Sequence, residues 1–281
     1  MYSLNCKGRL LNLEHPVVMG VLNITPDSFF EGSRIQSGSD LIRQAGFMLD
    51  SGAAILDLGG LSSRPGSVEI SIKEEIERVV PAIQLISERF PEAFISIDSY
   101  RFEVAEAAVR AGAVIINDIG AGESDELVKL AASEKIPYVC MHMRGKPDNM
   151  QQLTGYDDLL TEVLDYFIRR KMECVQMGIK DLIIDPGFGF AKTITQNFLL
   201  LKHLKLLKIL DLPVLVGLSR KATIYKTLGI QPEHALNGTT ALHTLAIEQG
   251  ASILRSHDVK EAAEVIRLWG SYASAQAPLS E

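Results

Sequence analysis

Residues 93–118 read AFISIDSYRFEVAEAAVRAGAVIIND, and this stretch carries the pattern that decides the fold. Two largely apolar runs, 93–97 and 113–116, lie on either side of a stretch whose apolar residues recur at helical spacing. Asp98 and Asn117 follow the two runs directly. Short apolar runs bounded by polar or glycine residues are typical of parallel strands that are buried on both faces. The stretch therefore predicts a strand–helix–strand unit.

The same alternation continues along the whole chain. Apolar runs stand at residues 17–22, 53–58, 93–97, 113–116, 137–141, 182–184, 213–217 and 251–254. Amphipathic stretches separate them, the longest at 156–177. Eight such units fit a (β/α)8 TIM barrel, an α/β fold that typically takes about 250 residues. We expect one domain over residues 1–281, with the barrel proper at about 16–270. An open doubly wound sheet is the alternative that the pattern alone leaves open.

The composition excludes several classes of protein. Of 281 residues, 47% are hydrophobic and 22% are charged, which is typical of a globular protein and not of a disordered chain. A net charge of −7 argues against a nucleic-acid partner. No apolar run reaches the roughly 20 residues that a membrane span needs. The cysteines, Cys6, Cys140 and Cys174, are odd in number and scattered, so we expect reduced thiols in a soluble cytoplasmic protein.

Polar groups stand at the end of nearly every apolar run. In chain order they are Asn23, Asp57, Asp98, Asn117, His142, Asp185, Ser219 and Arg255. In a (β/α)8 barrel the carboxyl ends of all strands lie at one face, where active sites of this fold are built. The sequence therefore predicts an active site made from many strand ends.

Three of these groups suit a flat heterocycle. Asp98, Asn117 and Asp185 are rich in acceptors, and a carboxylate can take two parallel N–H bonds from a guanidine-like edge. Phe190 offers a ring face for stacking. The alternatives are helix N-caps for the acidic residues and core packing for Phe190.

Other strand-end groups suit an anion. Lys221, Arg255 and His257 follow the last two strands, where this fold frequently holds phosphate. The Gly-Gly-Leu-Ser-Ser-Arg-Pro-Gly stretch at 59–66 adds hydroxyls and the fork of Arg64. A solvated rim is the alternative for the cationic groups.

Asn23 opens a stretch, 24–40, with little periodicity and two adjacent phenylalanines, which we interpret as an active-site loop. The amide of Asn23 could help to hold a Mg²⁺ ion that is already bound to phosphates, or simply shape a turn. The histidines lack metal-ligand spacing, and neither a G-x-S-x-G nor a Walker motif occurs.

The chain resembles the dihydropteroate synthases, the pterin-binding barrels of folate biosynthesis. The resemblance rests on eight motifs in the family's order, at residues 19–29 (MGVLNITPDSF), 57–66 (DLGGLSSRPG), 95–99 (ISIDS), 116–119 (INDI), 141–143 (MHM), 185–190 (DPGFGF), 217–221 (GLSRK) and 255–258 (RSHD). It implies a transferase that joins (7,8-dihydropterin-6-yl)methyl diphosphate and 4-aminobenzoate into 7,8-dihydropteroate and diphosphate. It also implies Mg²⁺ as cofactor, a homodimer through helices late in the barrel, and sulfonamides as inhibitors.

The resemblance assigns residues to these roles. The pterin would be held by Asp98, Asn117, Asp185 and Lys221, with Met141 and Phe190 nearby; the diphosphate by Ser63, Arg255 and His257; Mg²⁺ by Asn23; and 4-aminobenzoate beside Arg64 and Pro65. Gly217 and Ser256 lie within matched motifs and join the substrate-binding set, and Lys221, Arg255 and His257 would be catalytic. The chemistry suggests an SN1-like path, in which the cations offset charge on the leaving diphosphate.

Some positions depart from the family's usual residues. Leu61 replaces a frequent Glu or Val, and Ala191 stands before Lys192 where glycine is usual. Two alternatives remain: a methyltetrahydrofolate:corrinoid methyltransferase, which shares the pterin-holding acids but needs no diphosphate pocket, and a pterin-binding homologue without catalysis.

Overall fold

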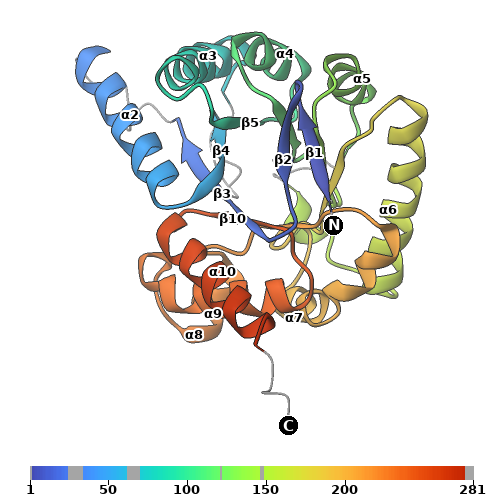
Figure 1. The fold of residues 1–281 in the computed structure, drawn as a ribbon. Coiled ribbons are helices and arrows are strands. Elements are labelled where there is room, and N and C mark those ends of the chain that lie inside the picture. The colour runs from blue at the N-terminus through green and yellow to red at the C-terminus, as the bar shows by residue number, and fades with distance from the viewer. Residues whose placement is uncertain (1, 25–33, 62–69, 121, 146–148, 276–281) are drawn as a thin grey trace, which may run out of the picture.

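Eight parallel strands form a barrel in the computed structural model of this chain, which describes residues 2–24, 34–61, 70–120, 122–145 and 149–275 (Figure 1). They are β3 (Val17–Asn23), β4 (Ala53–Gly59), β5 (Phe94–Asp98), β6 (Ile115–Asp118), β7 (Tyr138–Met141), β8 (Leu182–Asp185), β9 (Leu215–Val216) and β10 (Ile253–Ser256). The strands from β3 to β8 pair consecutively, and β3 pairs with β10, which pairs with β9. A parallel bridge between Ile184 and Val214 joins β8 to the start of β9. This order confirms the (β/α)8 barrel and excludes the doubly wound sheet.

Helices surround the strands (Figure 1). They are α2 (Arg34–Asp50), α3 (Ile72–Arg89), α4 (Phe102–Ala111), α5 (Asp125–Glu134), α6 (Leu159–Gln176), α7 (Ile194–Lys202), α8 (Ala222–Leu228), α9 (Leu236–Glu248) and α10 (Val259–Ala273), with short 3-10 helices at Met150–Gln152, Leu204–Leu210 and Pro232–His234. Side-chain caps mark where several begin: Ser71 accepts from Glu74 N at α3, and Thr193 forms a capping box with Gln196 at α7.

The core has two layers because side chains of a strand alternate between its faces. In one layer, side chains on the outer faces of the strands pack against side chains of the helices. The other fills the barrel interior with one side chain from most strands: Met19, Ile55, Ile115, Val139, Ile183, Leu215 and Ile253. Leu4, Cys6, Leu11 and Leu13 belong to this inner cluster, so the segment that precedes the barrel covers it at one end.

That covering segment is a hairpin that the sequence analysis missed. Strands β1 (Ser3–Cys6) and β2 (Arg9–Asn12) pair antiparallel through a turn at Lys7 and Gly8, both with positive φ. The hairpin lies across the barrel in Figure 1. Because its apolar side chains belong to the inner cluster, this end of the barrel is filled, which leaves the carboxyl end for chemistry.

The expected loop at 24–40 is wrong in its second half, because α2 begins at Arg34. Gly38 is a poor helix former. A Cβ at this glycine would lie 3.3 Å from Leu85 Cδ2, so the small residue permits close packing on α3. Tertiary packing has overridden local propensity here. Residues 25–33 of the expected loop lie outside the described residues.

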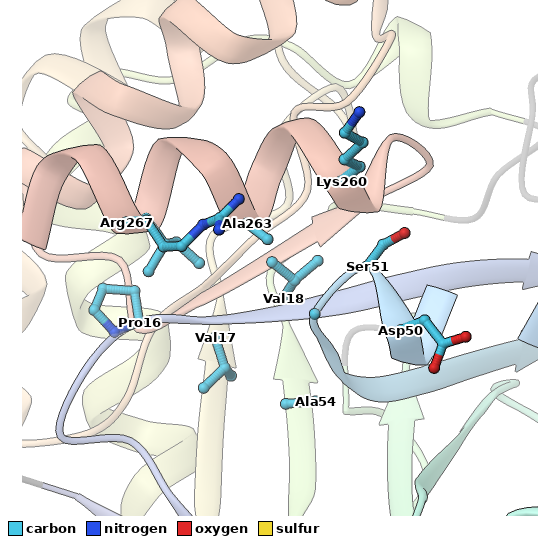
Figure 2. A pocket seen from close by; sticks show the side chains of 11 residues that line it. Pro16, Val17, Val18, Asp50, Ser51, Ala54, Lys260, Ala263 and Arg267 are labelled. Carbon is cyan, nitrogen blue, oxygen red and sulfur yellow. The ribbon is translucent and has the colours of Figure 1, made fainter. Parts of the chain in front are cut away.

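A groove of about 530 Å³ runs beside the starts of β3 and β4 (Figure 2). It is lined by Pro16, Val17 and Val18, by the turn after α2, and by Lys260 and Arg267 of α10, among others. None of the predicted site residues lines it. Within the described ranges, no helix is both long and apolar enough to cross a membrane.

Candidate active site

The positions of the functional side chains follow from those of the inner core residues, because side chains on one face of a strand recur every two residues. Ile55, Ile115, Ile183 and Ile253 fill the barrel. Two residues further along each of these strands come Asp57, Asn117, Asp185 and Arg255. The polar groups thus sit on the strands themselves, one layer above the core, where the backbone holds them rigidly.

Arg255 joins two of the acidic residues into one network. Its Nε lies 2.6 Å from Asp57 Oδ2 and its Nη2 lies 2.6 Å from Asp98 Oδ2. Asn117 Nδ2 donates to the same Asp57 oxygen over 3.1 Å. Asp57, which the sequence analysis left without a role, is therefore at the centre of the site, and it is fully buried.

The network leaves three buried acceptors without a hydrogen-bond partner in the described structure: Asp57 Oδ1, Asp98 Oδ1 and Asn117 Oδ1. An unsatisfied buried polar atom costs about 1–3 kcal/mol, so native proteins rarely keep one without a reason. Three such atoms on adjacent strands fit a ligand that presents several N–H donors along one edge.

A lysine and an aromatic ring form the opposite wall. Lys221 is the N-cap residue of α8, and its Nζ lies 4.5 Å from the centroid of the Phe190 ring and donates to the carbonyl of Phe188. Phe190 packs with Met141 and other apolar residues in a small buried cluster. A Cβ at Gly217 would lie 3.6 Å from Lys221 Nζ, which is an ordinary contact, so Gly217 lies beside the ammonium without being required for its placement.

Burial changes the protonation of these groups. It raises the pKa of Asp98 to about 7, against the opposing effect of Arg255, and it also raises the pKa of Asp185. Burial lowers the pKa of Lys221 to about 8, against the attraction of Asp185. Acids and bases with pKa values near neutrality are typical of functional sites.

His257 lies beside Ser219, at the ends of β10 and β9. Ser219 Oγ is 3.1 Å from His257 Nδ1, and the backbone N–H of His257 donates to the same hydroxyl over 3.2 Å. The exposed imidazole faces solvent. Arg220, next in the chain, instead holds the carboxylate of Asp258 with two nitrogens, at 2.9 and 2.7 Å, and so ties the two loops together.

The remaining predicted residues fall into three groups. Asn23 is exposed at the end of β3, opposite Gly59 in the sheet register. Ser256 is buried, and its hydroxyl donates to the carbonyl of Asp258 and accepts from the Asp258 N–H, so it shapes its own loop. Ser63, Arg64 and Pro65 lie outside the described residues.

Two arginines hold the described ends of the segment that contains Ser63. Arg78 Nη1 donates to the carbonyl of Gly60, and Arg101 Nη1 donates to the carbonyl of Ile70 and to the buried carboxylate of Glu75. Sequence analysis missed both arginines, because the backbone carbonyls of Gly60 and Ile70 that they bond are not identified by any motif.

Comparison with known proteins places this site in a family. A model described as pterin binding enzyme matches residues 19–257. The dihydropteroate synthase of Escherichia coli (strain K12) is 42% identical over 276 residues, 98% of each chain, and that of Bacillus subtilis (strain 168) is 40% identical over 258 residues, 91% of this chain and 88% of the relative.

Solved structures give the same result. The Yersinia pestis dihydropteroate synthase with a sulfonamide drug complex superposes with a TM-score of 0.90 at 39% identity, covering 98% of this chain and 100% of the other. The Xanthomonas albilineans enzyme in complex with 7,8-dihydropteroate superposes with a TM-score of 0.87 at 35% identity, with the same coverage.

Proposed function

This chain belongs to the pterin-binding enzymes and within them to the dihydropteroate synthases, and we propose how its own residues divide the work of that reaction. As a transferase, it joins (7,8-dihydropterin-6-yl)methyl diphosphate to 4-aminobenzoate, giving 7,8-dihydropteroate and diphosphate. The observation that carries the assignment of residues is the set of three unpaired buried acceptors on β4, β5 and β6, because a pterin presents the N–H donors that they lack.

The acceptors hold the pterin by its edge. Asp98 and Asn117, with Asp57 between them in the network, accept N–H bonds from the pterin, and Asp185 accepts from the other side of the barrel. Phe190 and Met141 enclose the ring faces. Satisfying buried acceptors makes this recognition selective, since a ring without those donors would leave them unpaired.

The cations stabilise the departing diphosphate. Breaking the pterin CH₂–O bond places negative charge on the diphosphate and positive charge on the methylene, which the dihydropterin ring delocalises. Lys221 and Arg255, both partly buried, act with the exposed His257 and with Ser63 to offset the first charge. The path is SN1-like, and the weakly basic amine of 4-aminobenzoate then attacks without a general base. Arg64 and Pro65 complete the aminobenzoate site, where a sulfonamide would compete.

Mg²⁺ fits the residues that are present. No group of three His, Cys, Asp or Glu in the described ranges could hold a metal by itself, and the exposed amide oxygen of Asn23 is a hard ligand at the mouth of the barrel. Magnesium commonly takes one or two protein oxygens and completes its shell with phosphates and water. When bound, the ion supplies additional positive charge to the diphosphate.

Replacement of Asn23 should increase the Mg²⁺ concentration that the reaction requires. We expect EDTA to abolish turnover, and Asn23→Ala to raise the Mg²⁺ concentration for half-maximal rate by about tenfold, since one of the few protein ligands is lost. The measurement is initial rate against Mg²⁺ concentration. Asn12→Ala, in the hairpin that covers the barrel, is the control and should leave the curve unchanged. An unchanged curve for Asn23→Ala would remove Asn23 from the metal site.

The ionisations of Asp98 and Lys221 should determine how the rate depends on pH. We expect kcat/KM for the pterin substrate to rise as pH passes about 7, where Asp98 becomes a carboxylate that accepts N–H bonds, and to fall above about 8, where Lys221 loses its charge. Because Asp98 and Lys221 interact, the two limbs of the pH profile give pKa values of the interacting groups together and not of either residue alone. Lys221→Arg should move the alkaline limb upward; a limb that does not move would assign it to another group.

The reaction assay tests the function itself. Purified protein is mixed with Mg²⁺, dihydropterin diphosphate and 4-aminobenzoate, and dihydropteroate and diphosphate are followed by chromatography with an EDTA control. Stoichiometric formation of both products is expected. Pterin binding without turnover would favour the non-catalytic homologue. Omitting 4-aminobenzoate tests the path: slow release of a pterin alcohol and diphosphate supports SN1, and strict dependence of bond cleavage on aminobenzoate argues against it.

We propose a homodimer through the late helices, because large apolar side chains are exposed there. Leu228 on α8, Leu245 on α9, and Leu268 and Tyr272 on α10 are all more than half exposed. Sedimentation should give twice the mass of one chain. Leu268→Glu should shift the protein to monomer, whereas Phe47→Glu, at an exposed position of α2, should not. A wild-type monomer at micromolar concentration would contradict the proposal.

We also propose that the protein works in the cytoplasm, free of membrane and nucleic acid. All three cysteines are buried free thiols, which fits a reducing compartment.

A further inference from the structure

The side chain of Lys192 is buried at 4% exposure directly after the segment that carries Asp185 and Phe190. Its Nζ lies 2.9 Å from His142 Nδ1, 3.1 Å from the carbonyl of Gly187 and 3.1 Å from the carbonyl of Phe190. The carbonyl of His142 is 3.5 Å away. In the proposed mechanism this lysine has no role.

Lys192 is an unusual buried amine, because none of the ion pairs within the described ranges includes it. Burying an amine is costly unless its hydrogens are all bonded. Here neutral acceptors from two different segments take that role, His142 from the end of β7 and carbonyls from the loop after β8. The side chain therefore joins the ends of two adjacent strands, β7 and β8.

The loop between β8 and α7 needs such a tether. Gly187, Gly189 and Ala191 all have positive φ, at 69°, 84° and 48°. A Cβ at Gly187 would lie 2.0 Å from the His142 carbonyl oxygen, so the loop backbone presses directly on the end of β7. Ala191 has the left-handed conformation although it carries a side chain, so its backbone is strained. Contacts elsewhere must hold this path in place.

The two lysines of the site hold this loop from different segments. Lys221 bonds the carbonyl of Phe188, while Lys192 bonds the carbonyls of Gly187 and Phe190. Three carbonyls among four consecutive residues thus accept from lysine ammoniums. The next residue, Ala191, accepts from the Tyr156 hydroxyl over 3.1 Å.

We propose that Lys192 is a positioning residue, which ties the loop 186–191 to the end of β7 and so sets Asp185 and Phe190 against the pterin ring. This positioning role rests on the proposed function, which assigns Asp185 and Phe190 to pterin binding. Lys192 does not touch substrate. We expect its effect mainly in the pterin half of the site, since its partners among the described residues come from the end of β7 and the loop after β8.

The electrostatics of the pair agree with this arrangement. Burial, aided by Lys192, lowers the pKa of His142 to about 2, so the imidazole stays neutral and its Nδ1 can accept. Burial lowers the pKa of Lys192 to about 7, against Asp185 and together with Lys221 and Arg144. Either protonation state of the amine keeps N–H donors for the Gly187 and Phe190 carbonyls.

The test is a comparison of two Michaelis constants in the full-length enzyme with Mg²⁺. Lys192→Met keeps the length and removes the donors. We expect the KM for dihydropterin diphosphate to rise about tenfold to a hundredfold, because a misplaced group of this kind costs that much. The KM for 4-aminobenzoate should change less than about twofold. Lys202→Met, at an exposed position of α7, is the matched control and should change neither constant.

A second variant distinguishes loss of the hydrogen bonds of Lys192 from misfolding of the protein. Lys192→Gln keeps N–H donors without the charge and should restore part of the pterin KM. A folded Lys192→Met with the wild-type pterin KM would overturn the proposal, and so would equal rises in both KM values, which indicate general loosening. Wild-type protein without turnover would instead overturn the proposed function, so the two failures are distinguishable.

Discussion

Lys221→Ala should lower kcat/KM by at least about a hundredfold while the protein stays folded. The ammonium contacts the Phe190 ring and the carbonyl of Phe188, and burial has already lowered its pKa to about 8. Charge placed where the diphosphate leaves is the kind of interaction whose removal costs about 10²–10³ in rate. Because we also assign this residue to the pterin site, both kcat and the pterin KM should suffer.

The measurement is steady-state kinetics together with a thermal melt. Lys226→Ala, at an exposed position one turn along α8, is the control and should behave as the wild type. Near-normal turnover in Lys221→Ala would end the catalytic role proposed here. A collapse of the melting temperature would show instead that the residue maintains the fold.

Arg255→Met should affect both stability and activity. Asp57 and Asp98 are buried, and each bonds Arg255 over 2.6 Å, so the change leaves two buried carboxylates without their cation. Breaking a buried pair in this way costs about 3–5 kcal/mol. Turnover should be lost as well, since the change removes one of the cations that we propose for the diphosphate.

The pH dependence of this destabilisation has a definite sign. Burial raises the folded-state pKa of Asp98 to about 7, so the folded protein binds more protons than the unfolded chain and stability falls as pH rises through that value. Without Arg255 the pKa should rise further. Urea unfolding should therefore show a larger loss for Arg255→Met at pH 8 than at pH 6. The same loss at both pH values would contradict this account; Arg267→Met, on the exposed face of α10, should lose little at either.

Much of the site could be predicted because strands have a fixed period. Each of the eight predicted runs overlaps a strand of the barrel. Asn117 points inward, whereas its neighbour Asp118 does not, because Asp118 accepts from the Tyr138 hydroxyl and the Gly120 N–H. The two-residue alternation would also have placed Asp57, two positions after Ile55, in the site.

Other features depended on partners that are remote in sequence. The hairpin β1–β2 is too short for its pattern to stand out, and it is stabilised by packing on the barrel's inner cluster. In the sequence, Lys192 is a lysine after a glycine-rich loop with no apparent role. Its partner, His142 Nδ1, lies 2.9 Å from Lys192 Nζ but is 50 residues away in the chain. Arg78 and Arg101 bond backbone carbonyls, which every residue possesses and no motif marks.

The alternation of strands and helices, the end at which chemistry occurs and the types of group presented there could be read from the sequence, because they follow from local periodicity and from the order of strand ends. Closure of the strands into a barrel was one of two outcomes that this periodicity allowed, and the strand order decides between them. Which of those groups neutralise one another depends on the three-dimensional fold. Arg255 and Asp57 are separated by 198 residues yet lie 2.6 Å apart, and this pairing leaves the second oxygen of Asp57 as an unpaired buried acceptor. Charge balance and desolvation depend on distances in space, and sequence separation does not fix those distances.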